Sequence, residues 1–85
     1  MNELDADDAR PRGAAEELVA AIWCDVFDLE RIGRHDDFYD LGGHSLLAIR
    51  MASRLRDTMG LKVPVRLILD HPTVAEMAQL IEKPA

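Results

Sequence analysis

Apolar residues recur at helical spacing in several separate stretches of the chain, with polar residues at the intervening positions. The first stretch covers residues 14–28, where Glu16 and Glu17 suit the positive end of a helix dipole. The second covers about residues 45–59, after which Gly60 supplies a typical helix stop. The pattern therefore predicts two helices of similar length.

Two shorter helical segments follow, and each has a recognisable start signal. Pro64 begins a short piece over about residues 65–70, which the following His-Pro pair must terminate. Thr73 and Glu76 match the T-x-x-E capping box, which opens a final helix. The apolar residues of that helix share one face: Val74, Met77, Ala78 and Ile81.

Residues 29–44 separate the first two helices without sustained periodicity, and this segment is too long for a tight turn. A loop of this length in a small domain needs apolar anchors or a function. We expect it to pack through Ile32, Phe38, Tyr39 and Leu41. The predicted fold class is all-α: a small bundle of three main helices plus one short helix, with a long loop between helix one and helix two.

The N-terminal segment contains few apolar side chains and ends in an Arg-Pro-Arg-Gly run. We interpret residues 1–13 as a flexible leader and residues 14–83 as a single domain. The chain starts with Met and contains no second domain, so two interpretations stay open: a freestanding protein or a domain cut from a longer one. The leader carries no recognisable tag, which slightly favours a freestanding protein.

Composition and charge argue against several classes of function. A chain of 85 residues, 48% of them hydrophobic, supports one small globular domain with little room for an enclosed active site. The net charge of −6 argues against nucleic acid, whose phosphates demand a basic surface. Cys24 is the single cysteine and no apolar run approaches the length of a membrane span, so we expect a reducing, cytoplasmic setting.

Catalytic and metal-binding patterns are poorly matched. The run from Gly43 to Leu47 begins like the G-x-S-x-G nucleophile elbow, but Leu47 replaces the second glycine and no β-strand precedes it. The histidines have no metal-ligand spacing, and the aspartates before the glycines do not match an EF-hand loop. No lysine follows the glycines, as a P-loop requires. We therefore expect neither a metal site nor enzymatic activity.

Ser45 stands at the start of the second predicted helix, directly after Gly42, Gly43 and His44. Serine is a preferred N-cap residue, and glycine before a helix lets the chain bend sharply. Capping alone accounts for a serine at this position in a plain helical interaction module. The surrounding residues have to decide whether this serine does more.

Residues 37–46, DFYDLGGHSL, closely resemble the carrier-protein family. They are similar in particular to the peptidyl carrier (thiolation) domains of nonribosomal peptide synthetases. In these domains an aromatic-acidic-Leu-Gly-Gly-His/Asp-Ser-Leu run places a modified serine at the start of helix two. The resemblance covers about residues 14–82, because the long loop and the Pro-Thr pair before the last helix also fit.

The resemblance implies that a separate phosphopantetheinyl transferase attaches 4'-phosphopantetheine from coenzyme A to Ser45. The chain is then expected to hold an aminoacyl or peptidyl group as a thioester, as a monomer. It would present that group to adenylation, condensation, thioesterase or tailoring enzymes. Gly42 and Gly43 leave the hydroxyl unshielded, and a phosphodiester at a helix N-terminus meets free N–H groups. The arm brings its own thiol, so Cys24 is expected to be a half-buried filler.

The charge around Ser45 favours a peptidyl carrier over the fatty-acid type, which typically has Asp before the serine and an acidic second helix. Here that residue is His44, and the second helix holds three arginines against Asp57. We interpret Arg50 and Arg54 as solvated, with no more than a bias in partner choice. A polyketide-type acyl carrier is the alternative within the family.

An apolar patch beside Ser45 is the predicted partner interface. Helical geometry turns Leu46 and Ile49 away from the core face that Leu47, Ala48 and Met51 form. We expect enzymes that act on the arm to dock on Leu46 and Ile49, together with the neighbouring His44 and Gly43.

Overall fold

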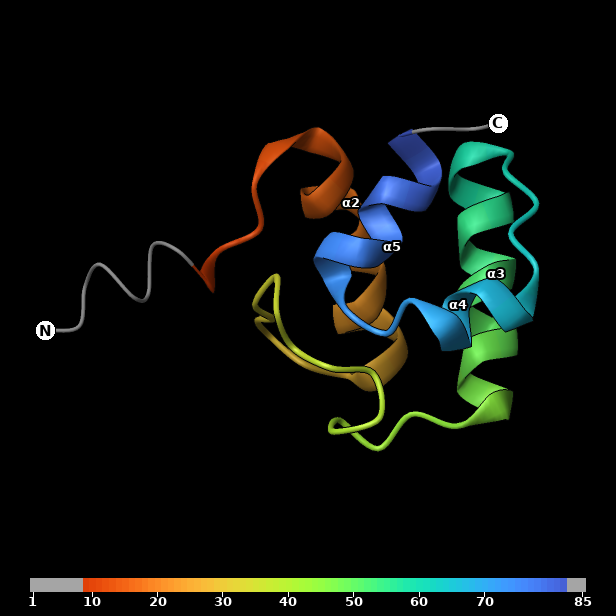
Figure 1. The fold of residues 1–85 in the computed structure, drawn as a ribbon, viewed down its shortest axis with the longest axis horizontal. Coiled ribbons are helices and arrows are strands. Elements are labelled where there is room, and N and C mark those ends of the chain that lie inside the picture. Colours follow the sequence, from red (N-terminus) through yellow and green to blue (C-terminus); the bar gives the residue numbers. More distant parts are fainter. Residues whose placement is uncertain (1–8, 83–85) are drawn as a thin grey trace, which may run out of the picture.

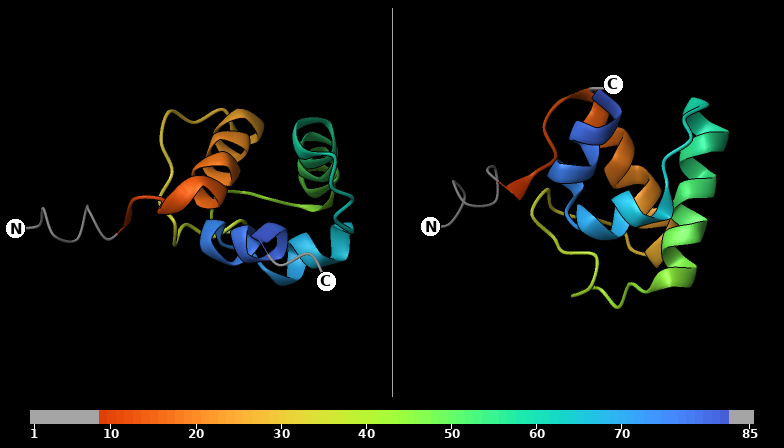
Figure 2. Two further views of the ribbon diagram at one scale, coloured as in Figure 1. Left: turned by 90° about the horizontal axis from the view of Figure 1, so that it is seen from above. Right: turned by 45° about the vertical axis from the view of Figure 1, so that its right-hand side comes forward.

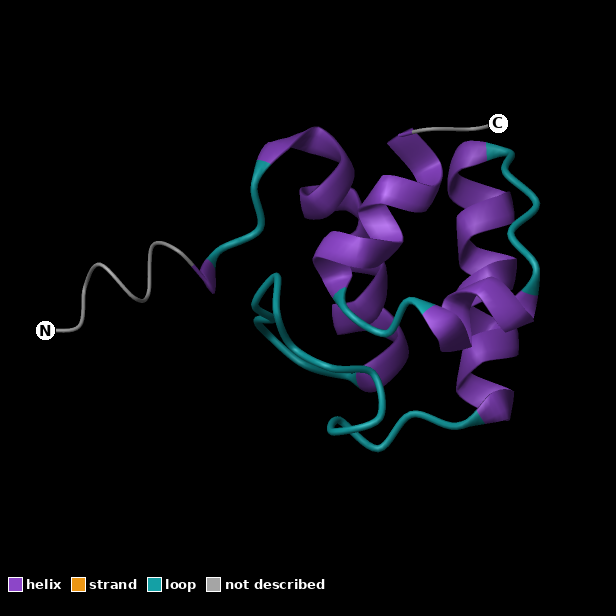
Figure 3. Cartoon of the chain, viewed as in Figure 1, coloured by secondary structure: helices purple, strands orange, loops and turns teal. Residues whose placement is uncertain are grey.

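Four helices make up most of residues 9–82, the part of the chain that this computed structural model describes (Figure 1). They are α2 (Gly13–Phe27), α3 (Ser45–Met59), α4 (Val65–Asp70) and α5 (Val74–Glu82). Within residues 9–82 the strand-like pairing is confined to an isolated bridge between Asp37 and Thr73 (Figure 3). The predicted all-α bundle, with its long loop before α3, is confirmed. None of the described helices is long and apolar enough to cross a membrane.

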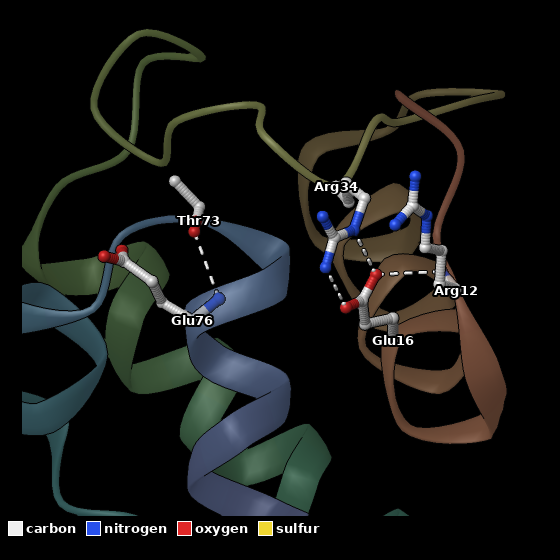
Figure 4. Close-up of polar contacts among 5 residues, drawn as sticks. All are labelled: Arg12, Glu16, Arg34, Thr73 and Glu76. Carbon is white, nitrogen blue, oxygen red and sulfur yellow. Dashed lines mark hydrogen bonds and ion pairs between the residues drawn. The ribbon is translucent and has the colours of Figure 1, made fainter. Parts of the chain in front are cut away.

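The predicted helix ends agree with the structure to within one residue, and the backbone shows why. α2 ends where Asp28 adopts a left-handed conformation with φ of 60°. Gly60 ends α3 in the same way, with φ of 71°, and its N–H donates to the carbonyl of Arg56 at 2.8 Å. α5 opens as the capping motif predicts, because the N–H of Glu76 donates to the hydroxyl of Thr73 at 3.1 Å (Figure 4).

The core forms where the helices cross. α2 packs against both α5 and α3, and α4 lies across α3 (Figures 1 and 2). Trp23 of α2 is fully buried at this junction, and its indole N–H donates to the sulfur of Met77 in α5 at 3.4 Å. Other side chains with no exposed surface come from every helix and from the loop: Val19, Phe38, Ala48, Met51, Leu55, Ile68 and Val74.

Phe38 brings the long loop into this core. Its ring lies edge-on to Trp23 and Phe27, with centroid separations of 5.9 and 5.4 Å. Its N–H donates to the carbonyl of Pro72 at 2.6 Å, beside the bridge that joins the loop to the start of α5. Ile32 is also buried. The predicted loop anchors at Ile32 and Phe38 are therefore confirmed.

Tyr39 anchors the loop in a way that the apolar pattern does not predict. Its side chain is 50% exposed, and its ring rests edge-on against Phe38 with centroids 5.7 Å apart. The hydroxyl donates to the carbonyl of Leu69 in α4 at 2.9 Å. A polar contact at the surface, rather than burial, therefore ties this part of the loop to α4.

An ion pair between α2 and the loop holds the other end of the loop (Figure 4). The guanidinium of Arg34 donates from Nε and Nη2 to the two carboxylate oxygens of Glu16, at 2.8 and 2.7 Å. These hydrogen bonds, with a further one from the N–H of Arg12, lower the pKa of Glu16 to about 2, although burial acts in the opposite direction. The Arg34 backbone also donates to the carbonyl of Ala9 and accepts from the N–H of Ala75.

The predicted leader, residues 1–13, overlaps the described chain only in part. Gly13 is the first residue of α2, and the hydrogen bonds of Ala9 and Arg12 place residues 9–12 against the loop and α2. Residues 1–8 and residue 83, the end of the predicted domain, lie outside the described residues. The predicted domain boundaries therefore stay predictions.

A second ion pair joins α3 to α2. Arg54 pairs with Asp25 through Nη1 and Oδ2, and both side chains are about half exposed. Arg54 is solvated, as expected, and the sequence pattern did not predict its partner Asp25. An exposed pair of this kind contributes about 0.2–1 kcal/mol, so the fold depends on it only weakly.

Candidate functional site

A tight turn leads the chain from the buried Phe38 toward the start of α3. The Oδ1 atom of Asp37 accepts the N–H groups of Tyr39 and Asp40, at 2.7 and 3.1 Å. The carbonyl of Asp37 accepts the N–H of Leu41 at 3.1 Å. These three bonds fix the direction in which the chain enters the two glycines that follow.

The backbone requires glycine at both positions of the pair, for different reasons. Gly42 has φ of 92°, a conformation that side chains rarely adopt. A Cβ on Gly43 would lie 2.6 Å from the carbonyl oxygen of Phe38 and closer still to ring carbons Cδ2 and Cε2 of that residue. The N–H of Gly43 donates to the same carbonyl at 2.8 Å. The two glycines thus let the backbone pack closely against Phe38 directly before α3.

His44, and not Ser45, is the N-cap of α3. Its backbone is extended, with φ of −153°, and its carbonyl accepts the N–H of Ala48 at 2.9 Å. Ser45 is the first helical residue, and the N-cap side chain makes no capping hydrogen bond. The interpretation of Ser45 as a helix cap is therefore wrong, because a cap oxygen belongs to the extended residue that precedes the helix.

Ser45 is exposed at the positive end of a 15-residue helix. The N–H groups of residues 45–47 precede the first intrahelical bond and point toward this end of the axis. The first turn contains no acidic side chain. A negative group attached to the Ser45 oxygen would therefore meet hydrogen-bond donors and a favourable dipole, without a like charge in that turn.

The apolar side chains next to Ser45 face solvent, as helical geometry predicts. Leu46 is 59% exposed and Ile49 is 53% exposed, whereas Ala48 and Met51 are fully buried. His44 is exposed as well, while Gly43 is half-buried against Phe38. The predicted exposure of Leu46 and Ile49 is confirmed, and their role as a partner interface stays a prediction.

The remaining reactive side chains offer little chemistry. The Nδ1 atom of His71 lies 2.9 Å from the carbonyl of Leu67 in α4, a contact within its own part of the chain. Cys24 is half-buried, as expected, and burial raises the pKa of its thiol, which favours the unreactive protonated form. Among residues 9–82 no three His, Cys, Asp or Glu side chains are grouped to hold a metal ion.

The comparison with known protein families decides what kind of site this is. Residues 17–81 match the family described as a phosphopantetheine attachment site, and this match includes the loop, α3, α4 and nearly all of α5. The chain belongs to the phosphopantetheine attachment family. The predicted 4'-phosphopantetheine cofactor of this carrier domain is thereby confirmed.

Three relatives define the type of carrier domain. A component of the linear gramicidin synthase of Brevibacillus parabrevis is 55% identical over 71 residues, which is 84% of this chain but 1% of that protein. A chain in the solved complex of the phosphopantetheine transferase Sfp with coenzyme A and a peptidyl carrier protein has a TM-score of 0.82 at 30% identity, covering 87% of this chain and 96% of that one. BlmI, a type-II acyl carrier protein from Streptomyces verticillus involved in bleomycin biosynthesis, has a TM-score of 0.75 at 32% identity, covering 80% of this chain and 82% of that one. The predicted similarity to peptidyl carrier domains is confirmed.

The described residues fit an attached phosphopantetheine. The attachment needs an exposed hydroxyl that neighbouring side chains leave accessible, and Ser45 follows two glycines and is exposed. The sequence did not reveal what holds this loop in place, namely the pair of Arg34 with Glu16 and the contact of Gly43 with Phe38. Only the contact of Gly43 with Phe38 left a trace in the sequence, namely the second glycine of the pair. The φ of Gly43 does not itself require glycine.

Proposed function

We propose that Ser45 carries the 4'-phosphopantetheine group and that the domain holds aminoacyl or peptidyl groups as thioesters in nonribosomal peptide synthesis. The observation that supports this most strongly is the exposed Ser45 at the first position of α3, in a chain that belongs to the phosphopantetheine attachment family. The identity of 55% with a component of the linear gramicidin synthase supports the peptidyl type.

The residues of the site have separate tasks in this proposal. Ser45 provides the oxygen that becomes esterified, and the N–H groups of residues 45–47 stabilise the negative charge placed there. When bound, the phosphopantetheine group supplies a thiol that forms the thioester. Phe38, Gly42 and Gly43 hold the loop so that the hydroxyl stays at the surface.

The domain itself is not an enzyme in this proposal, and other proteins act on it. A phosphopantetheinyl transferase attaches the group, an adenylation domain or enzyme loads it, and condensation, thioesterase or tailoring enzymes use it. The complex that contains Sfp, coenzyme A and a peptidyl carrier protein supports the first of these partners. We place the monomeric domain in the cytoplasm, where a single half-buried cysteine stays reduced.

The partner interface that we propose is centred on Leu46 and Ile49. Both are large aliphatic side chains, more than half exposed, on the first two turns of the helix that begins at Ser45. Exposed His44 lies at the edge of this surface, with Gly43 beside it. Any enzyme that reaches the Ser45 oxygen approaches this part of α3, so burial of the two side chains contributes to its docking.

Intact-mass spectrometry tests the proposed function. The chain is incubated with coenzyme A, magnesium and a broad-specificity phosphopantetheinyl transferase, and we expect its mass to rise by one phosphopantetheinyl group. Omission of coenzyme A is the control. No mass gain with an enzyme that modifies a known carrier in parallel would contradict the proposal and would favour an unmodified helical module.

A further inference from the structure

An open groove of about 450 Å³ lies along α3 and begins at Ile49, next to Leu46. Residues 60–64 run back beside α3 and lead into α4 (Figures 1 and 2), and residues of this segment and of the start of α4 line the groove together with α3. Its apolar part comes from Ile49, Ala52, Val63 and Val65, and two cationic side chains, Arg56 and Lys62, also line it. We call this feature the α3 groove.

The α3 groove continues directly from the attachment site. Ser45, Ile49, Ala52 and Arg56 are spaced at i, i+4, i+7 and i+11, so they lie on one face of α3. The groove therefore begins one turn beyond Ser45 and extends for about 10 Å along the helix. A protein that reaches Ser45 along this face covers the groove at the same time.

Charge is unevenly distributed along the chain, and the stretch that contains α3 and the loop after it is cationic. Residues 45–66 contain five cationic side chains and one acidic side chain, a net charge of +4, in a chain of net charge −6. The remaining residues therefore carry −10. Arg54 is paired with Asp25, while Arg56 and Lys62 are exposed beside the apolar floor of the groove. The α3 face thus presents an apolar strip with a cationic border in an otherwise acidic protein.

This charge favours one class of occupant. An aminoacyl group, or a peptidyl group with a free N-terminus, has an ammonium of the same sign as Arg56 and Lys62, so the groove is poorly suited to a carried group of this kind. A partner surface with carboxylates has the opposite sign. We propose that the α3 groove docks an acidic segment of a partner enzyme, with an apolar side chain against Ile49 and Val63 and carboxylates paired with Arg56 and Lys62. This inference rests on the proposed carrier function.

Titration of the ¹⁵N-labelled chain with two matched peptides tests the proposal. One is a helical peptide with leucines along one face and flanking glutamates, and the other has glutamine at each glutamate. We expect the acidic peptide to shift the amide signals of Ile49, Ser53 and Val63 and to bind at least about fivefold more tightly at low salt. The double variant Arg56→Gln, Lys62→Gln should remove this preference. The exposed loop cation Arg31 provides the control, because Arg31→Gln should keep it.

The outcomes separate this proposal from the carrier function. Each variant is also incubated with coenzyme A and the transferase, and we expect all of them to gain the full phosphopantetheinyl mass. If the unaltered chain were not modified, that result would count against the carrier function and not against the peptide result. Equal affinity for the two peptides, or shifts confined to α2 and α5, would overturn the acidic-partner proposal. Two further results would also overturn it. If the groove signals shifted on aminoacyl loading alone, the groove would be assigned to the carried group. If they shifted on self-association detected by sedimentation, the groove would be assigned to a second copy of the chain.

Discussion

Substitution of Gly43 by alanine tests how the chain is seated before the attachment site. The new Cβ would lie 2.6 Å from the carbonyl oxygen of Phe38 and closer still to its ring, and the ring is fully buried against Trp23 and Phe27. Neither the ring nor the loop can move without disturbing the other, because the N–H of Gly43 donates to that same carbonyl. Overpacking of this kind costs about 1–3 kcal/mol.

The neighbouring glycine provides the matched control. A Cβ on Gly42 meets no atom within 4 Å, but its φ of 92° is strained for alanine. Gly42→Ala should therefore cost about 1–2 kcal/mol through the backbone alone. The two variants lose stability for different reasons, and only the loss in Gly43→Ala depends on Phe38.

Urea unfolding of both alanine variants, each with and without Phe38→Leu, separates the two causes. We expect a coupling free energy of at least about 1 kcal/mol between positions 43 and 38, because the smaller side chain relieves the clash with the ring. Rescue should be partial, since the clash with the Phe38 carbonyl remains. Coupling near zero at position 43, or equal coupling at position 42, would refute this reasoning.

Three further predictions follow from the contacts around the site. The pKa of Glu16 is lowered to about 2 chiefly by Arg34, so the unfolded chain binds this proton first and stability falls as pH drops from about 5 to 2. Glu16→Gln should remove up to about 3 kcal/mol of that pH dependence in urea unfolding, and an unchanged slope would contradict the assignment. Tyr39→Phe removes the hydrogen bond to the Leu69 carbonyl and should lower the free energy of unfolding by about 0.5–1.5 kcal/mol, as measured by thermal melting. An unchanged melting temperature would contradict a stabilising role for this hydrogen bond. Leu46→Asp should leave the melting temperature nearly unchanged but slow modification by the transferase, and wild-type rates with every partner would exclude Leu46 from the interface.

The helices could be predicted from sequence because their signals are local. The apolar stripe of α3 places Ala48, Met51 and Leu55 on one face, and the structure buries all three. Gly60 and the Thr73 cap act within a few residues of themselves, so pattern and structure agree at those helix ends. The exposure of Leu46 and Ile49 follows from the same geometry.

The features that the sequence did not predict are of two kinds. Some depend on contacts between residues far apart in the chain, and one depends on which of two adjacent residues caps a helix. Arg34 and Glu16 are 18 residues apart, and nothing in either local pattern marks them as partners. The cap of α3 falls on His44 and not on Ser45, because the backbone becomes helical one residue earlier than a serine cap would require. Gly43 is needed because a side chain there would clash with Phe38. Its own backbone conformation does not require glycine, so the local pattern could not reveal the reason.

The most direct test of the proposed function is modification of the Ser45→Ala variant. Because Ser45 is not the helix cap, alanine should change the free energy of unfolding by less than about 0.5 kcal/mol, as measured by circular dichroism. The wild-type chain should gain one phosphopantetheinyl mass with coenzyme A and the transferase, and peptide mapping should place it at residue 45, while the folded variant gains none. A folded Ser45→Ala variant that still gains this mass would contradict the assignment of Ser45 as the attachment residue.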